Sequence, residues 1–370
     1  MQSDQPVQCY SRINETMSDL RKQELTIWAN AESQHHVAHE VPATALESVS
    51  GDASFRRYFR LVTDTRSFIA VDAPPANENS RLFVQVAELL RGAGVSAPEV
   101  YAVDYENGFM LLEDFGDALY LPPLLEAQAK GDNALPETLY SAAIKALVAL
   151  QCGVDHSALA SYDREKLHTE MKLFENWFCE AFLELSLSKN EREIIASAFQ
   201  FLEDAALAQQ QVAVHRDFHS RNLLILAPAC FAAEASPGLI DFQDAVTGPY
   251  TYDLVSLLRD CYISWDAKLV RHWALSYLTM AKEKQLLPTI SEEQFIRDFD
   301  LMGLQRHLKV MGIFSRLCIR DKKPRYLADI PLVIHYFLDV SGQYQELAIF
   351  RNWFEKTVIP VARQKLTLDF

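Results

Sequence analysis

The sequence predicts an α+β protein with two lobes, a small antiparallel-sheet lobe followed by a large and mostly helical lobe. Up to Phe115, the apolar pattern gives the order strand, strand, helix, strand, strand. Beyond Phe115, helical periodicity dominates. A chain of 370 residues that is 49% hydrophobic can bury the cores of two lobes. We therefore expect an N-terminal lobe over residues 1–115 and a helical lobe over residues 116–370.

The N-terminal lobe is expected to begin with a helix and to continue with two hairpins separated by a second helix. Thr16 and Asp19 have the spacing of a capping box, which predicts the start of the first helix. The sequence Asn107-Gly108 is typical of a tight hairpin turn. The predicted elements are the helix Thr16–Asn30, the hairpin Ser54–Ala73, the helix Asn79–Arg91 and a second hairpin that ends at Phe115.

Most of the remaining chain is expected to be helical. Three short apolar runs, "VAV", "LLIL" and "GLI", interrupt the helical pattern and predict short strands. The predicted helices cover Pro136–Gln151, Arg164–Leu183, Asn190–Gln210 and most of the chain from Tyr250 onward.

Composition excludes several classes of function. Lys and Arg total 35 against 50 for Asp and Glu, which gives a net charge of −15 and disfavours binding to nucleic acid. The six cysteines include no CxxC pair, and this favours a reduced, cytoplasmic protein. We find no export signal and no apolar run long enough to span a membrane, so we expect no membrane partner.

The stretch "VHRDFHSRN", Val214 to Asn222, carries the clearest chemical pattern. His215, Asp217 and Asn222 have the spacing H-x-D-x-x-x-x-N of a phosphotransfer catalytic loop, and "GLIDF" then places Asp241 at the end of an apolar strand. Asp217 would orient an attacking hydroxyl and accept its proton. Asn222 and Asp241 would supply oxygen ligands to Mg²⁺. A single H-x-D or strand-end Asp is commonplace, but the ordered combination indicates a kinase that uses ATP and Mg²⁺.

Longer phrases suggest a family. "VHRDFHSRNLLIL" and "GLIDFQDAVTGPYTYDLVSLLRD" resemble the aminoglycoside phosphotransferase-like kinases, which have a protein-kinase-like fold. "SGDASFRRYFRL", "DAPP", "LLEDFGD" and "LMGLQRHLKVMGIFSRLCIRDKKPRYL" are similar to the anomeric sugar kinases of bacterial cell-wall recycling, which act on N-acetylmuramate and N-acetylglucosamine. The resemblance covers about Ser50 to Tyr326. It implies that nucleotide binds between two lobes and that the acceptor lies over the helical lobe.

The resemblance also implies roles for residues outside the catalytic loop. "LLEDFGD" matches the hinge, where backbone groups around Glu113 and Phe115 would pair with adenine. Asp253 matches an aspartate that holds the catalytic loop, although a helix-dipole role explains it equally well. The phosphate loop has a single glycine, so nucleotide contacts would come from Ser50, Gly51, Asp52, Ala53 and Ser54 together.

One departure from the family pattern concerns the phosphates. Asp72 stands at the end of the strand "FIAV", where the resemblance leads us to expect a lysine that pairs with the nucleotide phosphates. An aspartate cannot pair with a phosphate. One of three arginines, Arg56, Arg57 or Arg60, is the candidate replacement, with Arg57 preferred, and the alternative is that all three line an exposed strand face.

The acceptor is expected to be a small molecule. Only seven residues separate Asp241 from Pro249, which we interpret as the start of the next helix, so there is no room for a peptide-docking segment. An acidic sugar would require aromatic faces and a cation near Asp217. The preferred candidates are Arg259, Asp260, Arg306 and Arg316, with Tyr262, His307 and Arg320 as further ones; most such residues in helices rich in aromatic and charged side chains serve packing or surface pairing, which is the alternative for each.

Other interpretations stay open. The histidines of "HHVAH" lack a fourth metal ligand, and Asp244 is either a second-shell residue or an ordinary loop carboxylate. An aminoglycoside phosphotransferase is an alternative function, and an inactive nucleotide-binding scaffold is another. We expect a monomer or a weak homodimer, and the first 45 residues have no predicted role.

Overall fold

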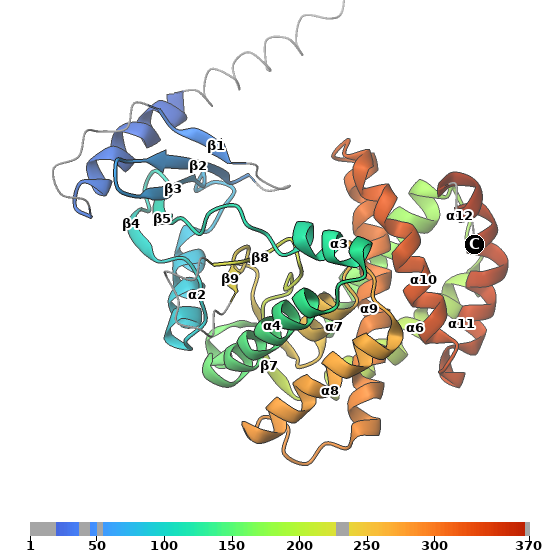
Figure 1. Ribbon diagram of the computed structural model, residues 1–370. Helices are drawn as coiled ribbons and strands as arrows, with labels where there is room; N and C mark the ends of the chain where they lie inside the picture. The colour runs from blue at the N-terminus through green and yellow to red at the C-terminus, as the bar shows by residue number, and fades with distance from the viewer. Residues whose placement is uncertain (1–19, 37–44, 50–54, 227–236, 367–370) are drawn as a thin grey trace, which may run out of the picture. The chain divides into compact units, whose positions relative to one another are not determined.

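The computed structural model describes residues 20–36, 45–49, 55–226 and 237–366. The chain divides into two compact units. Unit 1 comprises residues 1–92 and 96–117, and unit 2 comprises residues 93–95 and 118–370. Unit 1 holds an antiparallel sheet and unit 2 is mostly helical, which confirms the predicted fold class (Figure 1).

Unit 1 is built on a five-stranded antiparallel sheet with the order β1-β2-β3-β5-β4. Both predicted hairpins and the helix between them are confirmed, while β1 was not predicted. The described part of the leading helix covers residues 20–33, and its predicted cap lies outside the described residues. The elements are β1 (Glu47–Val49), β2 (Arg57–Val62), β3 (Ser67–Asp72), α2 (Ser80–Gly92), β4 (Val100–Asp104) and β5 (Phe109–Glu113).

The leading helix covers one face of this sheet (Figure 1). Its fully buried Leu25 and Ala29 pack with Phe68, Ala70 and Leu111 of the central strands. Alternate strand residues point to the same face, so Asp72, two residues after Ala70, also points toward the leading helix. The negative charge of Asp72 therefore lies within reach of side chains on the leading helix.

Gly108 fixes the turn between β4 and β5. Its φ is +72°, and a Cβ atom there would lie 2.0 Å from the carbonyl oxygen of Ala73. The carbonyl of Gly108 also accepts a hydrogen bond from the Ala73 N–H at 2.8 Å. The positive φ and the close approach to Ala73 both require a residue without a Cβ atom, which is glycine. This agrees with the predicted Asn-Gly turn.

Unit 2 is organised around α9 (Glu292–Ile319), whose middle is buried almost all round. Helices from distant parts of the sequence pack on it, and together they form one large apolar core (Figure 1). The other helices are α3 (Leu121–Lys130), α4 (Ala134–Gly153), α5 (Arg164–Leu173), α6 (Lys189–Leu207), α7 (Tyr252–Leu258), α8 (Ala267–Glu283), α10 (Ile330–Ser341), α11 (Ala348–Trp353) and α12 (Ile359–Leu366). The described parts of the chain contain no helix that is long and apolar enough to cross a membrane.

Several boundaries differ from the sequence predictions. The predicted helix Arg164–Leu183 changes to π-helical geometry over Phe174–Phe182, where Gly312 of α9 lets the two backbones approach closely. Helix α3 was not predicted. The predicted helix start at Pro249 is wrong, because Pro249 ends a strand and the helix begins at Tyr252.

Short strands in unit 2 position the stretch Val214 to Asn222 and the residue Asp241. β6 (Ala160–Ser161), β10 (Val246–Pro249) and β7 (Gln211–Val214) form one small sheet, and β8 (Leu223–Leu224) pairs with β9 (Gly238–Leu239) in another. The three predicted apolar runs therefore do form strands, and β10 adds a strand that was not predicted. The loop between β7 and β8 contains Asp217, and Asp241 follows β9.

Candidate active site

Asp253 of α7 holds the loop that follows β7. Its two carboxylate oxygens accept hydrogen bonds from the backbone N–H groups of His215 at 2.6 Å and Arg216 at 2.9 Å. Asp253 is fully buried, and Arg216 has a φ of +78°, a conformation that is strained for a residue with a side chain. These bonds confirm the expected hold of Asp253 on the loop backbone.

The carboxylate of Asp217 is charged but unbonded. Its oxygens form no hydrogen bond or ion pair with the described residues, and the side chain is half-buried. Burial on its own would raise the pKa of Asp217, but the charges of Lys309, His219 and Arg306 lower it to about 2. Asp217 is therefore ionised at neutral pH and free to accept a hydrogen bond from a bound molecule.

The cations around Asp217 are anchored to other partners. Lys309 is buried and lies 3.0 Å from the Glu170 carboxylate, which also pairs with Arg216. Lys309 donates a hydrogen bond to the Tyr252 hydroxyl at 2.8 Å. No sequence pattern indicated Lys309 and Glu170, because they lie 139 positions apart on helices without a motif, although a lysine inside a buried helix is itself unusual.

Asn222 and Asp241 lie together, as the motif predicts. The Asn222 amide donates to the Asp217 carbonyl at 3.0 Å and to the Asp241 carboxylate at 3.4 Å. Gln243 donates to the other Asp241 oxygen at 2.7 Å. Asp241 has a φ of +64°, so strained backbone occurs at Asp241 as well as at Arg216, the residue before Asp217.

The charge of Asp241 is not compensated. The side chain is open to solvent, yet protein atoms crowd it enough to raise its pKa, and the nearby carboxylates of Asp217 and Asp244 raise it further. We weigh the like-charge cause more heavily, because an accessible carboxylate loses only part of its hydration. A carboxylate in this situation favours a cation.

The donor set fits Mg²⁺ better than a softer metal. Asn222 offers an amide oxygen and Asp241 a carboxylate, which are hard ligands, and Mg²⁺ takes few protein ligands beside phosphate and water. No group of three His, Cys, Asp or Glu side chains within the described ranges could hold a metal by itself. Of the "HHVAH" histidines, His39 lies outside those ranges.

His215 is a buried, neutral side chain. It is 1% exposed, and burial lowers its pKa to about 4. Its Nδ1 accepts a hydrogen bond from the Asp217 N–H at 3.3 Å. The ring therefore supports the backbone of Asp217 from inside the protein.

Of the four preferred acceptor candidates, three are bonded to other residues of the protein and one is bonded to none of the described residues. Asp260 accepts hydrogen bonds from the backbone and hydroxyl of Ser220, at 3.0 and 2.5 Å, and thereby anchors the loop between β7 and β8. Arg259 pairs with Asp300, and Arg306 donates to the Arg216 carbonyl at 3.3 Å. Arg316 forms no ion pair or hydrogen bond with any described residue.

The further acceptor candidates are also engaged. Tyr262 lies under the guanidinium of Arg221, whose Cζ is 3.7 Å from the ring centroid. His307 stacks on Tyr336 and is buried. Arg320 binds both oxygens of its neighbour Asp321.

In unit 1, Asp72 is bonded to two arginines. It is fully buried, and Arg57 on β2 donates to it at 2.9 Å and Arg21 on the leading helix at 3.0 Å. Arg21 also donates to the carbonyl of Asn107 at 2.7 Å. This arrangement explains an aspartate in this strand, because its charge fastens the leading helix to the sheet.

The other two arginines of this region bind different carboxylates. Arg56 is buried and lies 2.8 Å from Glu78, just before α2. Arg60 pairs with Asp114 at 2.6 Å and with Asp117 at 2.7 Å, and these hydrogen bonds raise its pKa. Each of the three arginines, Arg56, Arg57 and Arg60, is therefore paired with a carboxylate.

The predicted nucleotide contacts are only partly described. Ser50, Gly51, Asp52, Ala53 and Ser54 lie outside the described residues. Glu113 ends β5, and its N–H donates to the carbonyl of Glu99 at 2.8 Å. The backbone groups of Phe115 form no hydrogen bond with any described residue, so they are available to a ligand.

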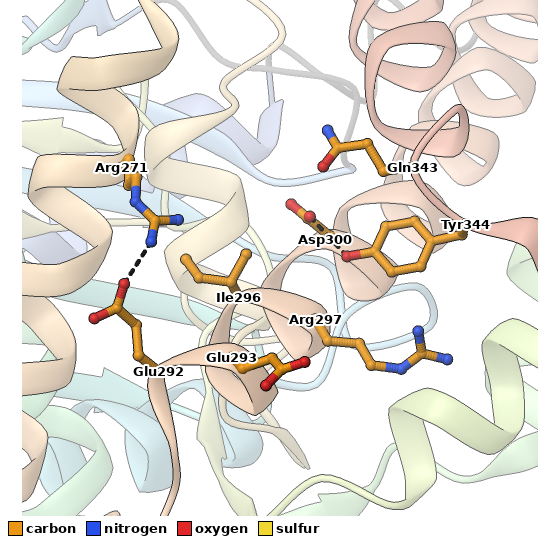
Figure 2. A pocket seen from close by; sticks show the side chains of 8 residues that line it. All are labelled: Arg271, Glu292, Glu293, Ile296, Arg297, Asp300, Gln343 and Tyr344. Carbon is orange, nitrogen blue, oxygen red and sulfur yellow. Dashed lines mark hydrogen bonds and ion pairs between the residues drawn. The ribbon is translucent and has the colours of Figure 1, made fainter.

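A separate pocket of about 580 Å³ lies at the beginning of α9 (Figure 2). Four of its five charged side chains are paired, Arg271 with Glu292, Arg297 with Glu346 and Asp300 with Arg259. No residue of the catalytic loop lines it, and we assign it no part in the reaction. The lining residues are Arg271, Glu292, Glu293, Ile296, Arg297, Asp300, Gln343 and Tyr344.

Comparison with known proteins identifies relatives over nearly the whole chain. An N-acetylmuramate/N-acetylglucosamine kinase of Pseudomonas putida is 41% identical over 89% of this chain and 94% of the relative. The protein with the same name in Pseudomonas aeruginosa is also 41% identical, over 89% of this chain and 95% of the relative. The kinase of that name in Neisseria meningitidis is 38% identical over 82% of this chain and 87% of the relative.

Solved structures share the fold at low identity. An ADP-bound aminoglycoside phosphotransferase matches with a TM-score of 0.51 and 16% identity, over 84% of this chain and 98% of that one. Choline kinase from Streptococcus pneumoniae matches with a TM-score of 0.53 and 14% identity, over 86% and 96%. The model of the phosphotransferase enzyme family matches residues 45–288. The chain therefore belongs to the phosphotransferase enzyme family.

Proposed function

We propose that this protein is an ATP-dependent kinase that phosphorylates the anomeric hydroxyl of N-acetylmuramate, N-acetylglucosamine or both. The names of the 41% identical relatives support the substrate class. The observation that carries the proposal is the Asp217 carboxylate, which is held ionised by surrounding cations and is bonded to none of the described residues. Such a group can accept a hydrogen bond from an acceptor hydroxyl.

Asp217 would act mainly by orienting the hydroxyl. With a pKa of about 2 it is a weak base, so it would not remove the proton before the reaction begins. Phosphoryl transfer has a loose transition state that requires little prior deprotonation of the nucleophile. The anomeric hydroxyl is also more acidic than an ordinary alcohol, because the ring oxygen withdraws electrons. His215, buried behind the loop, would position Asp217 without touching the substrate.

Asn222 and Asp241 would hold Mg²⁺. When bound, Mg²⁺ would offset the charge that develops on the phosphates. The raised pKa of Asp241 supports this role, because a cation would relieve the repulsion from Asp217 and Asp244. Gln243 would keep the Asp241 carboxylate in one orientation through its hydrogen bond.

Nucleotide binding would rest on unit 1. We propose contacts from Ser50, Gly51, Asp52, Ala53 and Ser54 to the phosphates and from the backbone of Glu113 and Phe115 to adenine, which the unbonded backbone groups of Phe115 support. Arg57 stays a candidate phosphate contact, although its bonds to Asp72 use part of its charge. Arg56 stays an alternative candidate, although its side chain is buried and paired with Glu78.

The proposal is tested by ADP release from Mg-ATP with N-acetylmuramate, N-acetylglucosamine or kanamycin as acceptor, with the Asp217→Asn variant alongside. We expect turnover with at least one amino sugar and its loss in the variant. Turnover with kanamycin alone would replace the substrate by an aminoglycoside. Absence of turnover with all three would contradict the kinase assignment and favour an inactive nucleotide-binding protein.

Two further expectations belong to this proposal. A monomer or weak homodimer in the cytoplasm would suit a small-molecule kinase of recycled sugars. Light scattering on the purified protein measures the oligomeric state. Fractionation of cells that express the tagged full chain measures the cellular location.

A further inference from the structure

Arg316 on α9 is a cation without a partner among the residues that the structure describes. The side chain is half-buried, its Nε atom is fully buried, and it forms no hydrogen bond or ion pair with any described residue. Burial lowers its pKa, and the charge of Arg320 lowers it further. A cation that is partly removed from water is normally paired, because the lost hydration is otherwise not offset. The absence of a partner is unexpected in a chain with a net charge of −15.

The carboxylates near Arg316 are already bonded to other groups. Glu170 is within electrostatic reach, but it pairs with Arg216 and with Lys309. Asp321 binds the guanidinium of Arg320 through both oxygens, at 2.7 and 2.9 Å. Among the described residues, no neighbouring acid is therefore left to compensate Arg316, and an anionic ligand would do so.

The position of Arg316 relates it to the candidate active site. Lys309 and Arg316 are seven residues apart on α9, which places them on the same helix face at a separation of roughly 10 Å along the axis. The charge of Lys309 lowers the pKa of Asp217, and Glu170 interacts with both cations. This face of α9 thus runs from the vicinity of Asp217 to Arg316.

The other cations in this region have different surroundings. Arg306 donates to the Arg216 carbonyl at 3.3 Å, and Arg259 pairs with Asp300. Arg221 is exposed and lies flat on the ring of Tyr262. Arg316 alone among the four combines a buried guanidinium atom on the Lys309 face of α9 with the lack of any described partner.

We propose that Arg316 binds the carboxylate of an acidic sugar and so favours N-acetylmuramate over N-acetylglucosamine. This inference rests on the proposed function. The two sugars differ in the lactyl ether of N-acetylmuramate, which carries a carboxylate, whereas N-acetylglucosamine is neutral. An arginine matches a carboxylate in charge and geometry, and it would be a specificity-determining residue that takes no part in phosphoryl transfer.

The test compares the full-length wild-type protein with Arg316→Met and Arg316→Lys in steady-state kinetics and in equilibrium titrations with each sugar. We expect Arg316→Met to lower kcat/KM for N-acetylmuramate about 10- to 100-fold, the range for a charge-assisted hydrogen bond, and to change the value for N-acetylglucosamine less than about threefold. Arg316→Lys should recover part of the loss. Arg320→Met, which removes a neighbouring but paired arginine, serves as the matched control.

The outcomes separate this inference from the proposed function. Equal losses with both sugars in Arg316→Met would assign the residue a structural role and overturn the inference, as would no loss with either. A selective loss in Arg221→Met that is absent from Arg316→Met would overturn it in favour of Arg221. If the wild-type protein neither binds nor phosphorylates either sugar, the proposed function fails and this inference fails with it.

Discussion

Asp72 in unit 1 and Asp217 in unit 2 both lie among arginine and lysine side chains, but only Asp72 is bonded to them. Two guanidiniums donate directly to the fully buried carboxylate of Asp72. The cations around Asp217 are bonded to Glu170, to Tyr252 and to a backbone carbonyl, and they influence Asp217 only through their charge. A bonded carboxylate stabilises the fold, whereas an ionised and unbonded one remains available to a substrate.

The largest expected effect comes from Asp217→Asn. The change preserves shape but removes the charge that would orient the acceptor hydroxyl, so kcat should fall about 10²- to 10⁴-fold. Nucleotide affinity, measured by titration with ADP, should stay within about threefold. Asp339→Asn, at an exposed position on α10, is the control; an equal loss of kcat there would mean that general negative charge matters and not the position of Asp217.

The next effect concerns the buried His215 behind the loop. Its pKa is about 4 in the folded protein and about 6.5 in an unfolded chain, so the unfolded state binds more protons between these values. Stability is therefore fully present above pH 6.5 and is lost as the pH falls toward 4, by about 3 kcal/mol from this group.

Urea unfolding at pH 7 and pH 4.5 measures this loss. His215→Gln should reduce the difference in unfolding free energy between the two pH values, whereas His272→Gln, at an exposed position on α8, should leave it unchanged. A difference that is the same in wild type and His215→Gln would show that His215 is not the group responsible.

Arg21→Met tests the bonded carboxylate of unit 1. Removing one partner leaves Asp72 buried with part of its charge uncompensated, which should cost about 2 kcal/mol of stability after allowance for the partial exposure of Arg21. Thermal unfolding measures the loss, and kcat should remain within about threefold. A large loss of kcat without a loss of stability would reverse the assignment and give the Arg21–Asp72 pair a part in the reaction.

The smallest predicted effect comes from Gln243→Leu. This change removes the 2.7 Å hydrogen bond to Asp241 but keeps a side chain of similar size. A hydrogen bond of this kind contributes about 1 kcal/mol, so kcat should fall about fivefold and the Mg²⁺ concentration for half-maximal rate should rise. A variant with unchanged Mg²⁺ dependence would show that Gln243 does not position Asp241.

The sequence predicted the fold class and supplied the central candidates of the site because both depend on local patterns. Periodicity identified the two hairpins of unit 1, and fixed spacing selected Asp217 and Asn222 as candidates. Strand β1 was missed because three residues are too short to show alternation, and β10 because its Gly248 and Pro249 are typical of turns.

The remaining parts of the site depend on contacts between distant positions. Arg21 and Asp72 are 51 residues apart, so no local pattern indicated that the leading helix would be fastened to β3. The cations near Asp217 and their bonding partners come from α5, α7 and α9, which the folded core brings together. Distinguishing bonded arginines from the unpaired Arg316 likewise required the structure.

The most direct test of the contrast between the two units is metal binding at Asp241, an exposed carboxylate of unit 2 whose pKa is raised in part by the charge of Asp217. Mn²⁺ as a probe for Mg²⁺ can be titrated into the full-length protein with ADP present and followed by electron paramagnetic resonance. We expect Asp241→Asn to weaken Mn²⁺ binding at least about tenfold and Arg21→Met to leave it unchanged, since the uncompensated charge lies in unit 2. Equal Mn²⁺ affinity in wild type and Asp241→Asn would contradict the account.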